Sequence, residues 1–473
     1  MLENIIYAIN RFFFFYMFLY AMMFFFTTFM ASVNLDDFFV RKKHMSYAML
    51  SNKDNYIPIS ILVPAFNEEV TIIDTIESLL NLDYPEYEVV VINDGSRDNT
   101  AQTLIDYYDL KQVARPIRRS VPCKELHSVY ENNDKVRIVL ANKENGGKSD
   151  ALNMGINISR FPLFVCMDAD SMLQNDALQK IVEAFLENDQ TIAVGGNIKV
   201  ANSTVMEKGR VVEQFAPKKP MILFQMIEYL RVFLASRVAF DGINANLIVS
   251  GAFGLYSKRA AINVGGYTTG IIGEDMELIV KMHAFYRKNK LDYRISYVPD
   301  AICWTQVPEK MSVLRSQRRR WHVGMGQSLK NHMFMLFNPR YGAVGMIAFP
   351  YFLFFEYITP ILDILGVITI VLSYIFGILN TWFFVGYLLV YMGYSMIVSM
   401  VAILLEKYLF PKTMSNRTLF KLLLFAVLES FGFRQLLSTF RFGAFFGPNK
   451  KQWGDMERTQ QAKRSSVETV TEE

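Results

Sequence analysis

Residues 12–33 contain no charged side chain, and this uncharged run limits how the chain can fold more than any other feature. At about 1.5 Å per residue, a helix of this length spans about 33 Å, which is enough to cross a bilayer. A cleaved signal peptide would have a shorter apolar core followed by small residues, whereas this run leads into the polar residues 34–37. We therefore expect a retained membrane anchor over residues 1–40. The basic residues 41–43 then place the following chain in the cytosol, by the positive-inside rule.

A second apolar block lies in the C-terminal part of the chain. Residues 364–405 carry no charge, and residues 377–380 divide them into two segments. The first segment is expected to begin near residue 347 and to pass Glu356 and Asp363 as a long, kinked helix. Carboxylates at membrane depth usually face a cavity or a helix bundle rather than lipid.

These runs predict four regions along the chain. Residues 1–40 form the anchor, residues 55–335 a cytosolic domain, residues 341–447 a transmembrane channel region, and residues 448–473 a cytosolic segment with a flexible tail. A cytosolic C-terminal segment requires either that residues 419–446 enter the membrane and return, or that the preceding apolar block holds three spans.

Composition excludes several classes of protein. Hydrophobic residues make up 52% and charged residues only 20%, which favours a membrane protein with a substantial soluble part. The formal net charge of +4 gives no support for nucleic-acid binding. The 3 cysteines are too few and too scattered for a disulfide framework or a zinc site.

The soluble part alternates β-rich runs with amphipathic runs. Strands are expected at residues 59–63, 88–92, 136–140 and 163–167, and helices at 70–82, 98–108, 150–158 and after Asp176. This order predicts an α/β fold with a mostly parallel sheet, which binds ligands beyond the carboxyl ends of its strands. Residues 111–134 show no clear periodicity and are expected to be an exposed, solvated excursion.

Three carboxylates follow predicted strands. Asp94 ends one strand, and Asp168-Ala169-Asp170 ends another. Mg²⁺ or Mn²⁺ is typically held by one or two carboxylates together with substrate phosphates, so this pattern favours a nucleotide-diphosphate site. Solvated turns are the alternative for both motifs.

Three further motifs each have a functional and a structural interpretation. Gly146-Gly147-Lys148 before a helix suits phosphate binding, but a plain turn would look the same. Asp275 after Gly273-Glu274 is either a general base for an acceptor hydroxyl or a helix cap. In Gln317-Arg318-Arg319-Arg320-Trp321, the indole either stacks on a sugar ring or anchors a basic interfacial helix.

Taken in order, these motifs closely resemble those of the processive polysaccharide synthases of glycosyltransferase family two. That family includes cellulose, hyaluronan, mixed-linkage glucan and poly-N-acetylglucosamine synthases. The resemblance covers about residues 58–325 and rests on the ordered set of Val63-Pro64-Ala65-Phe66-Asn67-Glu68, Asp94-Gly95-Ser96, Gly147-Lys148 with Ala151-Leu152-Asn153, Asp168-Ala169-Asp170, Ser250-Gly251-Ala252-Phe253-Gly254, Gly273-Glu274-Asp275 and Gln317 to Trp321.

The resemblance implies an inverting, UDP-sugar-dependent hexosyltransferase with a GT-A type domain. It implies a divalent cation (Mg²⁺ or Mn²⁺) on Asp170, Asp94 at the uridine, Asp168 at the sugar and Asp275 as the base. The implied nucleotide-sugar-binding residues are Pro64, Glu68, Asp94, Lys148, Asp168, Asp170 and His322. The implied acceptor-binding residues are Ser250, Gly251, Phe253, Gly254, Glu274, Gln317, Arg320 and Trp321. Residues 453–458 resemble a gating loop through Trp453, with Arg458 displaced from the family position.

Polymerisation of UDP-glucose into an exported β-glucan, either cellulose or a mixed-linkage glucan, is the preferred function, because Arg318 and Arg319 lie inside the acceptor motif. A poly-N-acetylglucosamine or hyaluronan-type synthase is the alternative. Two other readings stay open: transfer of one sugar to a lipid carrier, and a transporter with a nucleotide-sensing domain. The expected partners are the UDP-sugar, the growing polysaccharide, the lipid bilayer and accessory or regulatory subunits, but no nucleic acid. The expected location is the plasma membrane, with several spans and a cytosolic catalytic domain.

Overall fold

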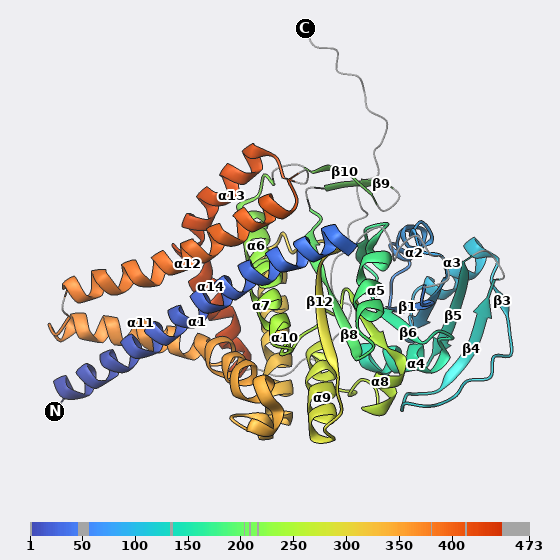
Figure 1. The fold of residues 1–473 in the computed structure, drawn as a ribbon, viewed down its shortest axis with the longest axis horizontal. Coiled ribbons are helices and arrows are strands. Elements are labelled where there is room, and N and C mark those ends of the chain that lie inside the picture. Colours follow the sequence, from blue (N-terminus) through green and yellow to red (C-terminus); the bar gives the residue numbers. More distant parts are fainter. Residues whose placement is uncertain are drawn as a thin grey trace, which may run out of the picture.

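The computed structural model describes residues 2–45, 56–132, 136–202, 204–207, 210–214, 217–379, 381–411 and 414–446. These residues form an α/β domain and a group of long apolar helices that project from one side of it (Figure 1). The predicted gating residues Trp453 and Arg458 lie outside the described residues.

One mixed, ten-stranded sheet forms the centre of the α/β domain. Strands β5, β2, β1 and β6 are parallel, β11 is antiparallel to β6 and β8, and β12 is again parallel to β8. The predicted α/β fold with a mostly parallel core is therefore confirmed. In spatial order the strands are β3 (Lys111–Gln112), β4 (Leu126–Glu131), β5 (Arg137–Lys143), β2 (Tyr87–Asn93), β1 (Ile59–Ala65), β6 (Leu163–Cys166), β11 (Gly254–Ser257), β8 (Thr191–Val200), β12 (Arg294–Thr305) and β7 (Ser171–Leu173). A separate hairpin joins β9 (Thr204–Glu207) to β10 (Arg210–Gln214).

Helices cover both faces of this sheet, so β1 and β2 are buried along their whole lengths. Alternate residues of β1 point to opposite faces: Ile61 and Val63 belong to one hydrophobic core and Leu62 to the other. The first core includes α2 (Ile72–Leu80), α3 (Thr100–Tyr108) and α5 (Ala177–Glu187). The second includes α4 (Lys148–Ile158), α8 (Lys258–Asn263) and α9 (Glu274–Lys288).

The excursion predicted at residues 111–134 is partly regular. Residues 126–131 form β4, which pairs antiparallel with β5 on one side and with the short edge strand β3 on the other, so the prediction of irregular chain is wrong there. Edge pairing satisfies backbone groups without any apolar periodicity, which is why the sequence pattern does not reveal this strand. Figure 1 shows β3 and β4 at the end of the domain farthest from the projecting helices.

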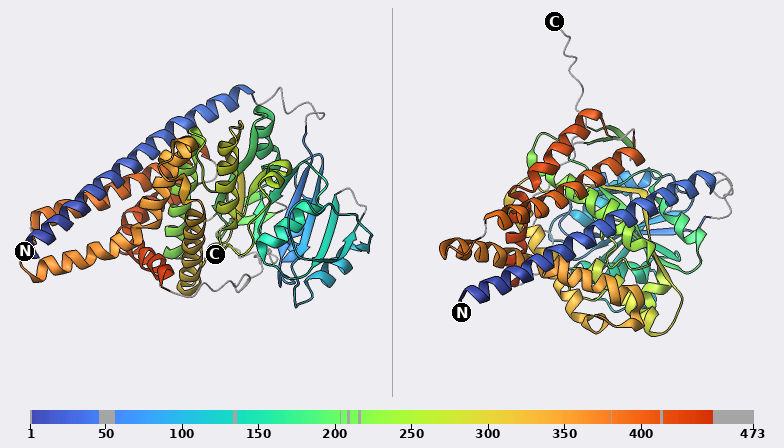
Figure 2. Two further views of the ribbon diagram at one scale, coloured as in Figure 1. Left: turned by 90° about the horizontal axis from the view of Figure 1, so that it is seen from below. Right: turned by 60° about the vertical axis from the view of Figure 1, so that its left-hand side comes forward.

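Two helical segments, Tyr7–Val40 and Phe384–Leu409, are long and apolar enough to cross a membrane. They belong to α1 (Leu2–Met45) and α12 (Thr381–Leu409), which lie beside α11 (Thr359–Ile375) in Figures 1 and 2. A third candidate is the pair Val344–Tyr357 and Thr359–Ile375, bent by 44°. The bend confirms the predicted kink, and Pro360 explains it, since proline lacks the amide proton that a continuous helix needs.

The third apolar stretch forms two short helices, α13 (Asn416–Glu429) and α14 (Phe433–Phe442). At 1.5 Å per residue they extend about 21 Å and about 15 Å, so neither crosses a membrane alone. The chain turns between them at Gly432, whose φ is 115°. The orientation of residues 419–446 relative to a bilayer stays a prediction.

A layer of helices joins the sheet to the apolar helices. It contains α6 (Pro220–Leu230), α7 (Arg237–Gly242) and α10 (Met311–Asn331). Among the described residues, three π-helical segments adjoin this layer, and such segments are frequent at functional sites. They are η2 (Arg231–Ser236), η5 (Val344–Ala348) and η6 (Tyr351–Tyr357); the short 3-10 turns are η3 (Met333–Met335), η4 (Pro339–Tyr341) and η7 (Gly443–Phe445).

Candidate active site

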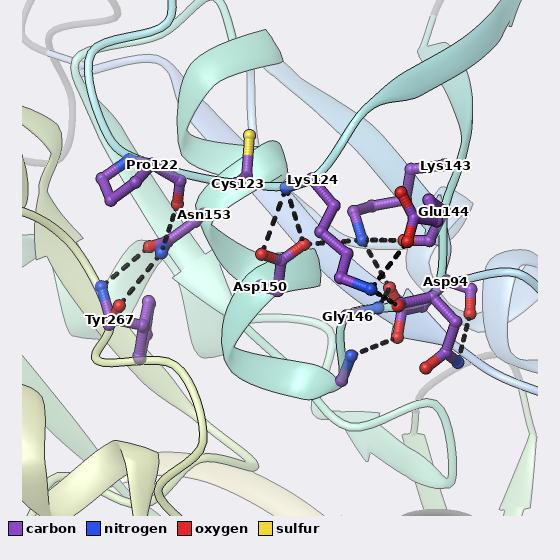
Figure 3. A network of polar contacts seen from close by, with 12 residues as sticks. Asp94, Pro122, Cys123, Lys124, Lys143, Glu144, Gly146, Asp150, Asn153 and Tyr267 are labelled. Carbon is purple, nitrogen blue, oxygen red and sulfur yellow. Dashed lines mark hydrogen bonds and ion pairs between the residues drawn. The ribbon is translucent and has the colours of Figure 1, made fainter.

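Asp94 follows β2 at the carboxyl edge of the sheet and is completely buried. Its Oδ1 accepts from Lys143 Nζ at 2.6 Å and from the Gly146 amide at 3.0 Å, and its Oδ2 accepts from the Gly147 amide at 2.7 Å (Figure 3). The carboxylate therefore fixes the loop that leads into α4. Contact between Asp94 and a uridine stays a prediction.

Lys143 completes a buried cluster that the sequence patterns did not reveal. Its Nζ also lies 2.7 Å from Asp150 Oδ1, so one buried cation holds two carboxylates (Figure 3). A Cβ on Gly146 would lie 2.5 Å from the Asp150 carboxylate, which explains why this loop contains glycine. The available signal was a lysine at the end of a buried strand, since a buried cation needs a carboxylate partner.

Asn153, in the same motif region, joins two loops to α4. Its amide nitrogen donates to the carbonyls of Pro122 and Tyr267, and its oxygen accepts from the Tyr267 amide at 2.8 Å (Figure 3). These contacts give Asn153 a structural role beside the candidate site.

Lys148 connects two motifs that are far apart in the sequence. Its Nζ lies 2.6 Å from Asp168 Oδ1 and 2.8 Å from Glu274 Oε1. Burial alone would lower the pKa of Lys148, but these two carboxylates raise it well above its usual value. The lysine at the start of α4 thus holds the Asp168 carboxylate against the turn that carries Asp275.

Asp275 lies in the first turn of α9, but the N-cap of that helix is Gly273. Its Oδ2 accepts from the Gly251 amide at 3.2 Å and its Oδ1 from the Met276 amide at 2.8 Å. Burial, together with the neighbouring charge of Glu274, raises the pKa of Asp275 to about 6. This carboxylate is therefore ionised near neutral pH and can still accept a proton readily, as a general base must.

Gly251 approaches both groups closely. A Cβ at this position would lie 3.2 Å from Lys148 Nζ and 3.6 Å from Asp275 Cβ, so a larger residue would crowd the predicted base. Ser250 is half-buried beside it. Phe253 and Gly254 are instead buried in the sheet: Phe253 packs over Gly196, and Gly254 begins β11. Their predicted acceptor contacts are untested.

Asp170 is half-buried, and its carboxylate has a weak bond of 3.4 Å from the Ser171 hydroxyl. Burial and the adjacent Asp168 carboxylate raise the pKa of Asp170 to about 6. Within the described ranges, no three His, Cys, Asp or Glu side chains are grouped to hold a metal ion. Two carboxylates without a third protein ligand suit a cation whose remaining coordination positions are filled by substrate phosphate oxygens.

The other residues assigned to the donor occupy different surroundings. Pro64 is buried within β1, and buried Glu68 accepts a hydrogen bond from the Thr71 hydroxyl at 2.8 Å. His322 is buried between the rings of Tyr357 and Phe445, at centroid distances of 4.8 Å and 5.0 Å. Burial lowers the pKa of His322 to about 3, so the imidazole is neutral. A contact of His322 with a diphosphate stays a prediction.

Helix α10 brings the predicted acceptor motif to the turn that carries Asp275. Gly324 packs directly on Gly273, and a Cβ on Gly273 would lie 3.0 Å from the Gly324 backbone. Gln317 is buried, Arg320 is half-buried and Trp321 is 44% exposed. Arg318 is buried, so the interpretation that it belongs to an exposed interfacial face is wrong.

A polar cavity of 140 Å³ lies among the apolar helices next to α10. Arg231 and Glu429 form two hydrogen bonds across it, of 2.7 Å and 2.8 Å. Both carboxylates predicted to face a cavity, Glu356 and Asp363, line it. The rest of its lining includes the aromatic side chains of Tyr16, Tyr20, Phe24, Tyr351, Phe355 and Tyr394.

Two protein-family models match this chain, and several curated proteins are similar to it in sequence. Residues 60–210 match glycosyl transferase family 2, and residues 163–400 match glycosyl transferase family group 2. The chain is 32% identical over 293 residues to a poly-beta-1,6-N-acetyl-D-glucosamine synthase of Staphylococcus epidermidis, covering 61% of this chain and 60% of that protein. It is 32% identical over 313 residues to the synthase of the same name from Staphylococcus aureus, covering 66% and 63%. The matches thus span less than two thirds of these relatives.

Among solved structures, the fold is similar to that of a mannosyltransferase from Pyrobaculum calidifontis, determined in complex with GDP-Man and Mn²⁺. The TM-score is 0.52 at 16% sequence identity, with 94% of this chain and 98% of that chain covered. This likeness supports the fold assignment.

Proposed function

Because the chain belongs to the glycosyl transferase family 2 group, we propose that it is a membrane-embedded, inverting polysaccharide synthase that polymerises N-acetylglucosamine from UDP-N-acetylglucosamine. The observation that carries this proposal is the bridge through Lys148, which joins Asp168 to Glu274 beside Asp275. The bridge holds a donor-side carboxylate and a candidate base in one site, as sugar transfer requires.

The choice of sugar differs from the one that the sequence favoured. The relatives at 32% identity are named as poly-N-acetylglucosamine synthases, which supports the alternative reading over β-glucan. The preference for glucose rested on Arg318 and Arg319 lying inside the acceptor motif. Arg318 is buried against Glu228 and Trp321 and gives no such support.

In the proposed reaction, Asp275 removes the proton of an acceptor hydroxyl while that oxygen attacks the anomeric carbon of the donor sugar. The bond from the anomeric carbon to the diphosphate oxygen breaks, and UDP leaves with the electron pair. Attack from the opposite side inverts the anomeric carbon, so an α-linked donor gives a β-linked product. Trp321 offers an exposed aromatic surface for the terminal acceptor sugar.

A divalent cation is the expected cofactor. Asp170, with Asp168 beside it, would hold the ion, whose charge would stabilise the diphosphate leaving group. The hard oxygen donors of both side chains suit Mg²⁺ or Mn²⁺.

We further propose that the 140 Å³ cavity is part of the path by which the polymer leaves. Its polar and aromatic lining lies within helices whose outer faces are apolar, including Trp382 at 87% exposed. Charged side chains at such a position usually line a path for a polar substrate. This reading requires several membrane spans and a catalytic domain in the cytosol.

Purified full-length protein in lipid nanodiscs, incubated with labelled UDP-sugars, tests the proposal. UDP-N-acetylglucosamine should give a high-molecular-weight product that a β-hexosaminidase degrades, and UDP-glucose should not. The Asp275→Asn variant is the matched control. A polymer from UDP-glucose would restore the β-glucan reading, and a lipid-linked monosaccharide would show a non-processive transferase. Binding without transfer would indicate a nucleotide-sensing protein.

A further inference from the structure

Arg318 and Trp321 stand one turn apart on α10 and differ sharply in exposure. Arg318 is 1% exposed, and its guanidinium carbon lies 4.3 Å from the centre of the Trp321 ring. The indole therefore has one face covered by a buried cation, while the rest of the ring remains open. A guanidinium stacked on an indole stabilises the pair, most strongly where the contact is shielded from water.

A carboxylate from another helix fixes the Arg318 guanidinium. Arg318 Nη2 donates to Glu228 Oε2 at 2.7 Å, and Glu228 Oε1 lies 3.4 Å from Arg441 Nη2. Glu228 and Arg441 both line the polar cavity. One continuous set of ionic contacts thus runs from the ring of Trp321 to the cavity wall.

Two nitrogen atoms of Arg318 have no hydrogen-bond acceptor among the described residues. Its Nε and Nη1 atoms are buried, and no described residue accepts a hydrogen bond from either. The Oε1 atom of neighbouring Gln317 is buried and equally unpartnered. Each buried polar group without a partner destabilises the fold, so a packed motif with three such atoms calls for a functional explanation.

We propose that Arg318 is a positioning residue of the acceptor site: it holds Trp321 from its inner face, in the orientation in which the outer face of the indole meets the acceptor sugar. This inference rests on the proposed polymerisation. Because Glu228 reaches the cavity wall, the same contact aligns the sugar-binding ring with the exit path. Neither effect requires Arg318 to touch the UDP-sugar.

The test compares Arg318→Lys with Arg315→Gln in full-length protein in nanodiscs. Arg315 is the matched control, because it lies on the same helix near an aromatic ring, Phe440, but at 5.9 Å and exposed. Lysine keeps the charge for Glu228 and loses the planar group that covers the indole. The readouts are polymer formed, UDP released, and the KM values for UDP-N-acetylglucosamine and for an added β-1,6-linked N-acetylglucosamine oligosaccharide.

We expect Arg318→Lys to raise the KM for the oligosaccharide about tenfold, as loss of about 1.4 kcal/mol would do. The KM for the donor should stay unchanged, and UDP release should exceed sugar incorporation. If Arg318 had only a structural role, Arg318→Lys would lower UDP release and sugar incorporation together. Unchanged oligosaccharide KM in Arg318→Lys, or an equal rise in Arg315→Gln, would overturn the proposal.

Fluorescence gives a readout independent of catalysis. The contribution of Trp321 is the difference between the wild type and Trp321→Phe, and Arg318→Lys should change its intensity while Arg315→Gln should not. If wild-type protein makes no polymer, the proposed function fails, yet this signal still decides whether Arg318 holds the ring. If Arg318→Lys does not fold, Glu228→Gln should raise the oligosaccharide KM in the same direction, and an unchanged KM there would refute the inference.

Discussion

Replacing Asp275 by Asn removes the negative charge of the candidate base and leaves the size of its side chain almost unchanged. A positioned general base typically contributes about 10²–10⁴-fold to a rate, so Asp275→Asn should lower sugar transfer by at least about a hundredfold. UDP binding should persist, because Lys148 and Asp168 are unchanged. Transfer is measured with labelled donor, and UDP binding by calorimetry.

The raised pKa predicts how wild-type activity depends on pH. Because burial and Glu274 raise the pKa of Asp275 to about 6, the base is about nine-tenths ionised at pH 7 and about one-tenth ionised at pH 5. Transfer should therefore fall about tenfold for each unit of pH below about 6. Asp275→Asn should lose the part of this acidic limb that Asp275 causes, and any limb that remains is assigned to Asp170, whose pKa is also raised to about 6 by burial and the adjacent Asp168.

The same shift predicts the effect on stability, with a definite sign. The folded protein binds the Asp275 proton more tightly than the unfolded chain, so this stability is fully present below about pH 4 and is lost as the pH rises through about 6. A rise in pKa from 3.8 to about 6 corresponds to about 3 kcal/mol, and because Asp275 is only half-buried, solvent screening reduces this to about 1–2 kcal/mol. Asparagine cannot ionise, so Asp275→Asn should melt higher than the wild type at pH 8 and equally near pH 4.

A helix-capping role predicts the reverse. An aspartate that stabilised the start of α9 through the helix dipole would contribute about 0.3–1 kcal/mol in its charged form. Asp275→Asn would then melt lower than the wild type at pH 8. Near-normal turnover together with a lower melting temperature would refute the general-base reasoning.

Three further outcomes are expected. Asp170→Asn should leave the protein folded and abolish transfer, and EDTA should do the same to the wild type; full turnover in EDTA would exclude a required cation. Trp321→Ala should impair polymer formation far more than UDP binding, whereas reduced membrane attachment with normal polymer yield would indicate an interfacial anchor. Lys143→Met leaves the carboxylates of Asp94 and Asp150 without their buried cation and should destabilise the fold by about 3–5 kcal/mol in thermal unfolding, and a loss below about 1 kcal/mol would contradict that role.

The sequence predicted the elements whose burial follows a local pattern. Strands β1, β2, β5 and β6 are each built around a short apolar run, and their ends place Asp94 and Asp168 at one edge of the sheet. Strand β4, next to the short edge strand β3, escaped notice because its side chains show no alternation, and only its pairing with β5 and β3 defines it. Residues 294–305 likewise form the long β12, whose partners β7 and β8 are distant in sequence.

The missed parts of the site depend on partners that are remote in the chain. The role of Lys143 becomes visible only in the folded chain, where Asp94 and Asp150 from two other segments form ion pairs with it. From the sequence alone, Arg318 is interpreted as part of a basic surface. Its buried partner, Glu228 on α6, lies 90 residues earlier in the chain. Motif spacing identifies residue types that can do chemistry, whereas the ion pairs that orient them arise from tertiary packing.

Two glycines on α10 show how the candidate site and the cavity are held together. Gly324 contacts the backbone of Gly273, and a Cβ on Gly326 would lie 2.5 Å from the ring of Tyr357 in η6. These contacts hold one helix against both the turn that carries Asp275 and the π-helical segment that supplies Glu356 to the cavity. Because packed interfaces of this kind shift as units rather than deform smoothly, a displacement of α10 would move Trp321 relative to the base and to the cavity wall together. In the proposed reaction, chain elongation with release into the cavity would then require no separate transfer of the acceptor between two sites.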